Sequence, residues 1–433
     1  MPGRILLKNG RVIDPANGID QTHDVLIVDG RISAVAQPGA LSEQPGGIAY
    51  DVAGKWVVPG LIDMHVHLRE PGHEYKETIE TGTRAAAAGG FTAVAAMPNT
   101  KPINDNQTVT VFILAKAGEA GFARVYPVGA ISSGSNGEQL AEFGELRQAG
   151  AVAVTDDGLP VGNSQLMRRA LEYASNHELL VISHAEEMTL SHGGAMNDGA
   201  LATRLGLRGI PRVAEEIMVY RDLALAEFTG RPIHIAHVST RESLSLIRRA
   251  KEKGVAVTAE TAPHYFTLTE KAVEGYNTLA KMNPPLRTDG DVAAVRDALQ
   301  DGTLDAIATD HAPHGELDKD KEFDLAANGI IGLETAVPLT LRLVREKQLD
   351  ARRMVELLSV NPARILGVPG GTLSVGAPAD ITVIDPEMKF VFTEESIQSK
   401  SRNSPFLGWE LQGKAVLTML AGRITWGQEI FSS

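Results

Sequence analysis

Hydrophobic and polar positions follow one pattern at the two ends of the chain and another in the middle. Residues 4–13 and 24–35 are short β-branched runs that contain Asn-Gly or Asp-Gly pairs, which is the pattern of β-hairpins. The same pattern returns in residues 371–384 and 415–426. We therefore expect the two chain ends to share one small β-sandwich.

In the middle of the chain, apolar runs alternate with stretches rich in Ala, Leu and Glu, as βα units around a parallel sheet do. Eight runs are expected to be strands: 61–67, 91–97, 125–131, 151–156, 179–184, 233–238, 255–261 and 305–309. Eight units favour a closed, TIM-like (β/α)8 barrel. An open doubly wound sheet is the competing topology, and periodicity does not exclude it, although no G-x-G-x-x-G turn follows an early strand to favour it. The expected organisation is an α/β chain with three segments: sandwich 1–58, barrel 59–367 and sandwich 368–433.

Composition supports this division into a large barrel and a small sheet unit, and it excludes some classes of partner. The chain has 433 residues, of which 43% are hydrophobic and 22% charged, enough for a large core plus a smaller companion. A formal charge of -13 argues against nucleic acid as a partner. Residues 1–14 do not resemble a signal peptide, and the weakly polar stretch 85–97 is shorter than the roughly 20 residues of a membrane span. No membrane association is expected.

Cysteine is absent from the sequence. This excludes disulfides, a thiolate nucleophile and sulfur ligands, so any metal must be held by His and carboxylate groups. The absence also fits the reducing cytoplasm, which is the expected location.

The sharpest local motif is Asp63-Met-His-Val-His-Leu-Arg69, at the end of the first expected barrel strand. Side chains alternate along a strand, so His65 and His67 face the same way and are able to bind one metal. By itself, however, such a pair is just as often two half-buried strand histidines.

Other metal-type residues also close expected strands. His184 ends Leu-Val-Ile-Ser-His, His237 ends Ile-His-Ile-Ala-His, and Asp310 ends Ala-Ile-Ala-Thr-Asp. In a βα barrel these ends meet on one face, where active sites are built. Each residue could separately be a cap or core residue, but together they predict a metal site at the barrel mouth.

A fifth strand end carries Asp156 and Asp157. One of them is able to bridge a pair of metals while the other caps the following segment, and spacing alone does not choose between them. Imidazole and carboxylate ligands favour zinc over manganese, iron or cobalt. A hydroxide activated by one or two zinc ions is the expected nucleophile, since no G-x-S-x-G elbow or P-loop indicates another chemistry.

Several longer motifs lie along the chain: Pro59-Gly-Leu-Ile-Asp-Met-His-Val-His-Leu-Arg-Glu-Pro-Gly72, Met97-Pro-Asn-Thr100, Glu260-Thr-Ala-Pro-His264, Lys281-Met-Asn-Pro-Pro-Leu-Arg287, Ala308-Thr-Asp-His-Ala-Pro-His314 and Gly376-Ala-Pro-Ala-Asp-Ile381. Together they resemble the long bacterial (type I) dihydroorotases of the amidohydrolase superfamily. The resemblance covers nearly the whole chain. It implies reversible cyclisation of N-carbamoyl-L-aspartate to L-dihydroorotate in pyrimidine biosynthesis.

The resemblance also implies residue roles. His65, His67 and Asp310 would hold one metal, His184 and His237 a second, and Asp157 would bridge, with Asp310 as the catalytic proton carrier. Hydantoinases and many other superfamily members bridge with a carboxylated lysine, and this sequence has no Lys from residue 117 to residue 250. That absence favours a dihydroorotase.

Substrate contacts are expected from His67, Arg69, Asn99, Asn283, His314, Asn328 and Gly329. Arg69 lies two residues beyond His67, so an extended chain would turn its guanidinium toward the metals, where it could clamp the ring carboxylate. The other contacts rest on the resemblance, and His264 is expected only as a supporting residue. The charged run 315–326 is expected to be a solvated loop, with a mobile cover over the substrate as the alternative.

Two rival functions stay open at this point. Another cyclic amidohydrolase, an allantoinase or dihydropyrimidinase, would share the fold and metals; Arg69 and the missing lysine argue against it. A non-catalytic dihydroorotase-like subunit of aspartate transcarbamoylase would be expected to lack the metal ligands. Aspartate transcarbamoylase stays a candidate partner of an active enzyme, and a homo-oligomer is expected.

Overall fold

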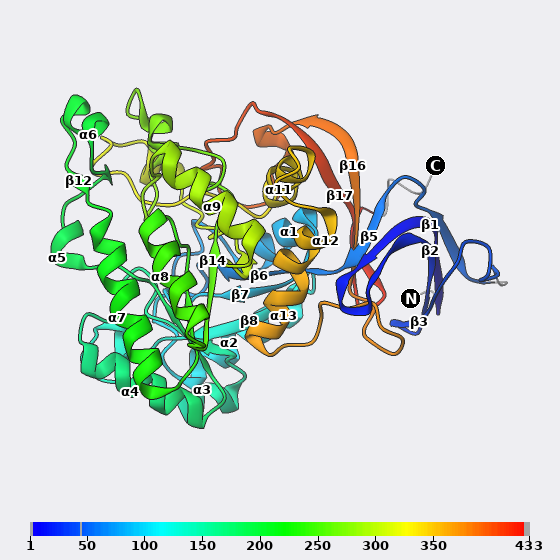
Figure 1. The fold of residues 1–433 in the computed structure, drawn as a ribbon. Helices are drawn as coiled ribbons and strands as arrows, with labels where there is room; N and C mark the ends of the chain where they lie inside the picture. Colours follow the sequence, from blue (N-terminus) through cyan, green and yellow to red (C-terminus); the bar gives the residue numbers. More distant parts are fainter. Residues whose placement is uncertain (1–2, 44–45, 428–433) are drawn as a thin grey trace.

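Parallel strands from the middle of the chain form a barrel in the computed structural model, which describes residues 3–43 and 46–427 (Figure 1). Within these residues the barrel sheet has eight strands in chain order: β6 (Leu61–Val66), β7 (Phe91–Ala96), β8 (Arg124–Gly129), β9 (Ala153–Val154), β10 (Leu180–Ser183), β13 (Ile233–Ile235), β14 (Val257–Thr261) and β15 (Ala306–Ile307). A parallel bridge between Val66 and His311 closes the ring, and the backbone N–H of His67 donates to the His311 carbonyl over 2.8 Å. The closed barrel is confirmed, and the open doubly wound sheet is excluded.

The observed strands end earlier than the apolar runs predicted. The expected strand 233–238 pairs only as Ile233–Ile235, and 305–309 only as Ala306–Ile307. His237 and Asp310 follow with left-handed backbone, φ 33° and 49°. Non-glycine residues rarely adopt this conformation, which turns the chain out of the strand ladder. The candidate ligands beyond β6 therefore lie on the first residues after the strands.

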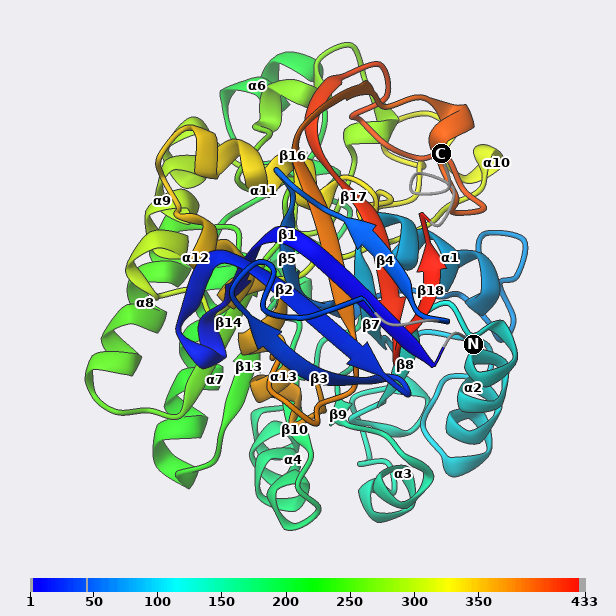
Figure 2. The ribbon, with the colours of Figure 1, turned by 90° about the vertical axis from the view of Figure 1, so that its right-hand side faces the viewer.

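Helices surround the barrel (Figure 2). The outer helices are α1 (Ile79–Gly89), α2 (Gln107–Ala120), α3 (Phe143–Ala149), α4 (Ser164–Asn176), α7 (Val213–Thr229), α8 (Arg241–Glu252), α9 (Asp289–Asp301), α11 (Ala336–Arg345), α12 (Ala351–Val355) and α13 (Asn361–Leu366). Between them lie α5 (Met188–Ser191), α6 (Ala200–Leu205) and α10 (Glu316–Lys319), with a small parallel pair formed by β11 (Met196–Asn197) and β12 (Gly209–Ile210). Polar side chains start many of these helices, as when Thr78 accepts a hydrogen bond from the backbone N–H of Thr81.

The barrel interior is filled with side chains. Small residues such as Ala93, Ala95 and Ala306 face larger ones such as Ile62 and Met64, and all of them are buried. A barrel packed in this way leaves no pore along its axis, so ligands have access only at its ends.

The two chain ends form one small sheet unit, as predicted. Its strands in the described residues are β1 (Arg4–Asp14), β2 (Ile19–Val28), β3 (Arg31–Ala36), β4 (Ile48–Asp51), β5 (Trp56–Pro59), β16 (Ile381–Val391), β17 (Glu410–Leu420) and β18 (Arg423–Trp426). They are hydrogen-bonded as one continuous sheet, with β4 and β5 pairing with different parts of β1. Residues from both ends, among them Leu7, Ile27, Val383 and Leu417, share one buried core inside this bent sheet.

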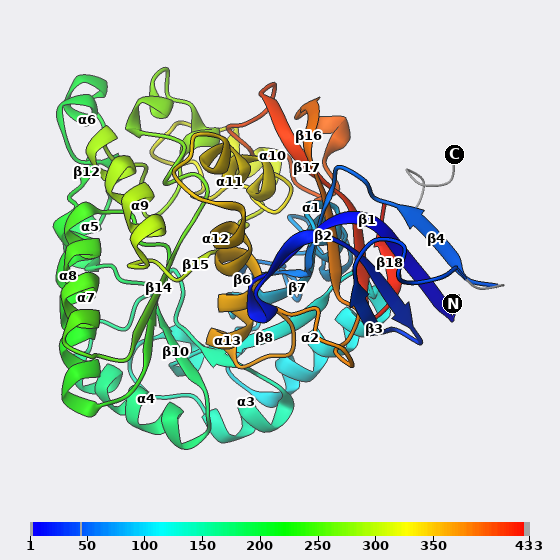
Figure 3. The same cartoon turned by 45° about the vertical axis from the view of Figure 1, so that its right-hand side comes forward.

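The C-terminal segment also reaches the barrel. Between β16 and β17, residues 392–409, here called the strap, leave the sheet and lie against the barrel (Figure 3). Phe392, Ile397 and Phe406 of the strap are buried in the barrel's main core. The strap therefore belongs to the packing of the barrel. In the described residues, none of the helices is both long and apolar enough to cross a membrane.

Candidate metal and substrate site

The first two histidines lie at the end of β6 and face two carboxylates. His65 Nε2 is 3.3 Å from Asp157 Oδ1 and 3.6 Å from Asp310 Oδ1. His67 Nε2 is 3.2 Å from Asp310 Oδ1 and 3.5 Å from Asp157 Oδ2. Both imidazoles thus point into one cluster, as strand alternation predicted.

The other two histidines complete the cluster. His237 Nε2 lies 2.9 Å from His184 Nδ1, and both nitrogens face Asp157 Oδ1, at 3.6 and 3.3 Å. Asp157 is therefore within 3.6 Å of all four histidines, which is the central position that a bridging carboxylate needs.

Asp156 has a different role from Asp157. Its carboxylate accepts hydrogen bonds from the backbone N–H groups of Ile131 and Ser132, at 2.8 and 3.1 Å, and from the Ser132 hydroxyl. It ties two neighbouring strand ends together, and Asp157 is left to face the histidines. Spacing alone could not separate the two, because both aspartates follow the same strand, and only the resemblance implied Asp157.

The donor set fits a metal ion. The Nε2 atom of His65 is buried and has no hydrogen-bond partner among the described residues. Two triplets, His65–Asp157–His237 and His65–His67–Asp310, each bring their ligand atoms within 4.8 Å of one another. An unpartnered buried nitrogen is costly unless a cation occupies the space before it. Imidazoles and carboxylates without sulfur suit zinc.

The electrostatics of the cluster suit a bound cation. Burial alone would raise the pKa of Asp157, but His65 and hydrogen bonds from His184 and His237 hold it well below its ordinary value. Burial would likewise raise the pKa of Asp310, and His65 and His67 lower it. Both groups are thus carboxylates, the form that binds a metal.

Two further carboxylates, not singled out by sequence reasoning, orient the histidines. Glu260 Oε1 lies 2.9 Å from His65 Nδ1, and Glu186 Oε2 lies 3.0 Å from His184 Nε2. Glu186 also accepts from Asn283 Nδ2 over 2.8 Å, which links a histidine to a predicted substrate contact. Only the spacing of Glu186 two residues after His184 could have marked it beforehand.

A cavity of about 230 Å³ opens above the cluster. It is lined by His67, Arg69, Asn99, Asp157, Gly158, His184, His237, Asn283, Asp310, Ala312, His314, Asn328 and Gly329. Apart from His65, which is 1% exposed, every predicted site residue lines it. Long-range folding has brought metal-type and substrate-type residues from separate segments into one small space.

Arg69 reaches the cavity by a route other than the one expected. The extended conformation does not persist, because Arg69 has φ 63°, so that part of the prediction is wrong. Its Nε donates to the Pro313 carbonyl over 3.1 Å, which aims the guanidinium at the cavity, and within the described residues its Nη1 makes no hydrogen bond. Burial lowers the pKa of Arg69 to about 10, so it stays cationic at neutral pH.

The polar neighbours of Arg69 are held in defined states. Asn99 Oδ1 lies 2.7 Å from His67 Nδ1, and its Nδ2 donates to Asp157 Oδ2 over 3.3 Å. Burial and the positive charge of Arg69 lower the pKa of His314 to about 2, so its imidazole is neutral.

His264 is buried, and its Nε2 has no partner among the described residues. It does not line the cavity, in keeping with a supporting place.

The charged run after Asp310 is only partly solvated. Leu317 is 82% exposed, but Lys319 is buried, and its Nζ donates to the carbonyls of Ala327 and Gly329 at 2.7 and 3.0 Å. Asn403 of the strap donates to the Gly329 carbonyl over 3.0 Å. The expectation of a simple solvated loop is therefore wrong for Lys319, and the backbone at 328–329 is fixed beside the cavity.

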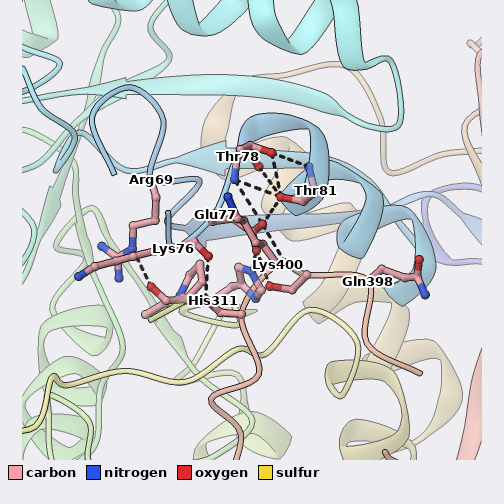
Figure 4. A network of polar contacts seen from close by, with 12 residues as sticks. Arg69, Lys76, Glu77, Thr78, Thr81, His311, Gln398 and Lys400 are labelled. Atoms are coloured by element: carbon pink, nitrogen blue, oxygen red, sulfur yellow. Dashed lines mark hydrogen bonds and ion pairs between the residues drawn. The ribbon is translucent and has the colours of Figure 1, made fainter. Parts of the chain in front are cut away.

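Asn403 and Glu77 were not predicted. Asn403 also accepts from the backbone N–H of His314, at 3.0 Å. Glu77 joins the start of α1 to the strap, because it accepts from Thr81 Oγ1 and from the Lys400 backbone N–H at 3.1 Å, and it faces His311 Nε2 at 3.4 Å (Figure 4). No motif could indicate these contacts, since their partners are up to 323 residues apart in the sequence.

Comparison with solved structures agrees with this fold. The solved structure of L-hydantoinase (dihydropyrimidinase) from Arthrobacter aurescens superimposes with a TM-score of 0.85 at 25% identity, covering 97% of this chain and 95% of that one. Dihydropyrimidinase from Brevibacillus agri gives a TM-score of 0.83 at 23% identity, over 99% and 96%. The barrel with its His and Asp cluster thus places the chain in the class of metal-dependent cyclic amidohydrolases.

Sequence relatives give the narrower family. A family model described as dihydro-orotase-like matches residues 54–243. The chain is 60% identical to a dihydroorotase from Syntrophotalea carbinolica, over 98% of this chain and 99% of that protein. It is 61% identical to one from Desulfotalea psychrophila, over 96% and 98%. The chain belongs to the dihydroorotase family.

Proposed function

We propose that this chain is a dihydroorotase that interconverts N-carbamoyl-L-aspartate and L-dihydroorotate. The observation that carries the proposal is a cluster of two carboxylates and four histidines beneath a cavity that Arg69 lines, with its Nη1 unpartnered among the described residues. A cyclic amide that bears a carboxylate matches this cavity, because its amide would face the cluster of histidines and carboxylates while its carboxylate would face Arg69. The close relatives named dihydroorotase support this reaction over that of the hydantoinases.

The metal is proposed to be zinc, one or two ions per chain. His65, His67 and Asp310 would hold one, His184 and His237 the other, and Asp157 would lie between them. When bound, zinc supplies Lewis acidity, which lowers the pKa of water and polarises a carbonyl group. The remaining chemistry belongs to the side chains of the chain itself.

Asp310 is the proposed proton carrier. Its carboxylate is ionised and lines the cavity, so in hydrolysis its Oδ is able to take the proton of the attacking water. The water oxygen bonds to the ring carbonyl carbon, the carbon–nitrogen bond breaks, and Asp310 returns the proton to the leaving nitrogen. Ring closure reverses these steps and consumes one proton overall, because a carboxylate is lost, so lower pH favours dihydroorotate.

Substrate orientation is assigned to the polar groups of the upper cavity. The unpaired Nη1 edge of Arg69 is the proposed clamp for the ring carboxylate, with Asn99 and Asn283 as additional donors. Neutral His314 and the backbone at Asn328 and Gly329 complete this side. The ring substrate of an allantoinase or a dihydropyrimidinase would offer no carboxylate for Arg69 to bind.

Two measurements test the proposal. Metal analysis of the purified chain should find zinc, and chelation should abolish hydrolysis of dihydroorotate until zinc is restored. The Asp310→Asn variant should retain its fold but lose nearly all turnover in both directions. More than about a tenth of wild-type activity in this variant would contradict the role of Asp310, since proton transfer contributes about 10²–10⁴-fold.

Some expectations from the sequence stay predictions. They are the cytoplasmic location, the association with aspartate transcarbamoylase and the number of metals bound. A scaffold without catalysis is disfavoured, because the complete set of ligand side chains gathers in one cluster.

A further inference from the structure

His314 lies between two side chains that are able only to donate hydrogen bonds. Its Nδ1 is 3.2 Å from Lys76 Nζ, and its Nε2 is 3.4 Å from Arg69 Nη2. Lysine and arginine side chains carry no acceptor, whereas a neutral imidazole has one N–H donor and one acceptor nitrogen. The ring of His314 is therefore able to accept from only one of these neighbours. Its other nitrogen carries a proton and faces a second donor.

The neutral form of His314 follows from its surroundings. Burial, followed by the charges of Arg69 and Lys76, lowers the pKa of the imidazole, and a backbone contact at Asn328 opposes them. The residue is only 9% exposed, so its neighbours in the protein, and not bulk water, decide which nitrogen carries the single proton.

The neighbours of Nδ1 identify it as the accepting nitrogen. The Lys76 carbonyl accepts from Ser401 Oγ of the strap over 2.7 Å, which fixes the backbone from which the Lys76 side chain reaches His314. Figure 4 shows the side chains of Lys76 and Arg69 extending to the same side. The Asp318 carboxylate is 3.8 Å from Nδ1, beyond hydrogen-bond distance, so it does not serve as an acceptor for a proton there. The proton is therefore on Nε2.

The protonated Nε2 and the Arg69 guanidinium face each other at the substrate cavity. Arg69 and His314 both line this cavity, and Lys76 is not among its lining residues. Two N–H donors 3.4 Å apart are satisfied together by one anionic oxygen that accepts from both. We infer that Lys76 is a positioning residue: by donating to Nδ1, it keeps the proton of His314 on Nε2, where it joins Arg69 in binding the ring carboxylate. The identity of this carboxylate rests on the function proposed above.

Nitrogen-15 NMR of histidine-labelled protein tests the tautomer without any turnover. The His314 signals are assigned by their absence from the His314→Gln variant. Wild type and Lys76→Arg should carry the ring proton on Nε2, whereas Lys76→Met should show both tautomers. Lys116→Met, which removes the same charge from the surface of α2, is the matched control and should give the wild-type spectrum. A proton on Nδ1 in wild type, or an unchanged tautomer in Lys76→Met, would overturn the inference.

Kinetics show whether Lys76 acts through His314. Lys76→Met should raise KM for dihydroorotate by about 10-fold with a smaller change in kcat, because part of the population presents a lone pair to the carboxylate. In the His314→Gln background the same substitution should change KM little, since the residue through which Lys76 acts is already absent. Additive losses in the double variant would assign Lys76 a role elsewhere and contradict the inference.

Asp318 provides a separate check, because Lys76 Nζ also lies 3.4 Å from its Oδ2. If Lys76 served only to hold the segment after Asp310, Asp318→Asn should reproduce the effect of Lys76→Met on KM, and that result would overturn the inference. We expect Asp318→Asn to keep the wild-type tautomer and a KM close to that of wild type. Absence of dihydroorotate turnover in wild type would contradict the proposed function, whereas the NMR spectra would still decide the role of Lys76.

Discussion

Glu260 accepts a hydrogen bond from Nδ1 of His65 over 2.9 Å, deep within the barrel. Burial would raise the pKa of Glu260, but hydrogen bonds from His234 and His65 lower it to about 2, so the group is a carboxylate and its imidazole partner carries the proton on Nδ1. His65 Nε2 is the atom that faces Asp157 and Asp310, where it is proposed to bind the metal. Through this contact a residue that does not line the cavity orients a proposed metal ligand.

Replacing Glu260 should therefore weaken metal binding. Glu260→Gln keeps the size of the side chain but loses the charge that selects the His65 tautomer, and loss of such a partner costs about 10–100-fold in metal affinity. Competition with a zinc chelator measures this directly. Glu172→Gln, on the surface of α4, is the control, and equal affinities for the two variants would contradict the positioning role.

Arg69 should determine selectivity for a carboxylate. Hydrogen bonds to charged groups contribute about 1.5–3 kcal/mol, so Arg69→Met should lose about 10–100-fold in kcat/KM for dihydroorotate. Inhibition by orotate, a planar ring with the same carboxylate, should weaken in parallel, whereas inhibition by a neutral ring should not change. Arg249→Met on α8 serves as the control. Equal losses for charged and neutral rings would mean that Arg69 acts only through the structure.

The strap should control substrate affinity through Asn403. This buried side chain donates to the Ala312 and Gly329 carbonyls and accepts from the His314 backbone N–H, each over 3.0 Å. Asn403→Ala leaves buried groups unsatisfied at a cost of about 1–3 kcal/mol each, so His314 and Gly329 should lose their fixed positions. We expect a lower melting temperature and a raised KM with a smaller change in kcat. Asn136→Ala, in an exposed loop, should change neither quantity.

Lys319 should make stability depend on pH. Burial lowers the pKa of Lys319 from 10.5 to about 7 in the folded chain, so between these values the unfolded chain binds more protons than the folded chain. Unfolding then takes up protons and becomes less favourable as the pH rises, which adds stability above pH 7 and removes it on acidification through about 7. Chemical denaturation from pH 6 to 9.5 should show the free energy of unfolding of wild type rising relative to Lys319→Met. A constant difference across this range would contradict the buried, shifted amine.

Periodicity and residue type were sufficient to predict much of this protein. Apolar runs alternating with helical stretches predicted a parallel sheet of βα units, and their number favoured a closed barrel over an open sheet. His65, His184, His237 and Asp310 were expected together because strand ends of a barrel meet on one face. These features are local, since each strand carries its own hydrophobic pattern and its own terminal residue. The sequence alone therefore determined that the chain is built of βα units and which imidazole and carboxylate groups are proposed to bind the metal.

Other features were decided only by the tertiary structure. Spacing left Asp156 and Asp157 equivalent, and the structure separates them physically, because the backbone amides of Ile131 and Ser132 lie within hydrogen-bond distance of Asp156 only. Several features depend on partners far away in the chain. They are the backbone turn at Arg69, the hydrogen bond between His65 and Glu260, and the hydrogen bonds that Lys319 and Asn403 donate to the Gly329 carbonyl. A local sequence pattern predicts on which face of its own strand or helix a side chain lies. The distances between segments and the hydrogen-bond partners of buried polar groups are fixed only when the barrel closes.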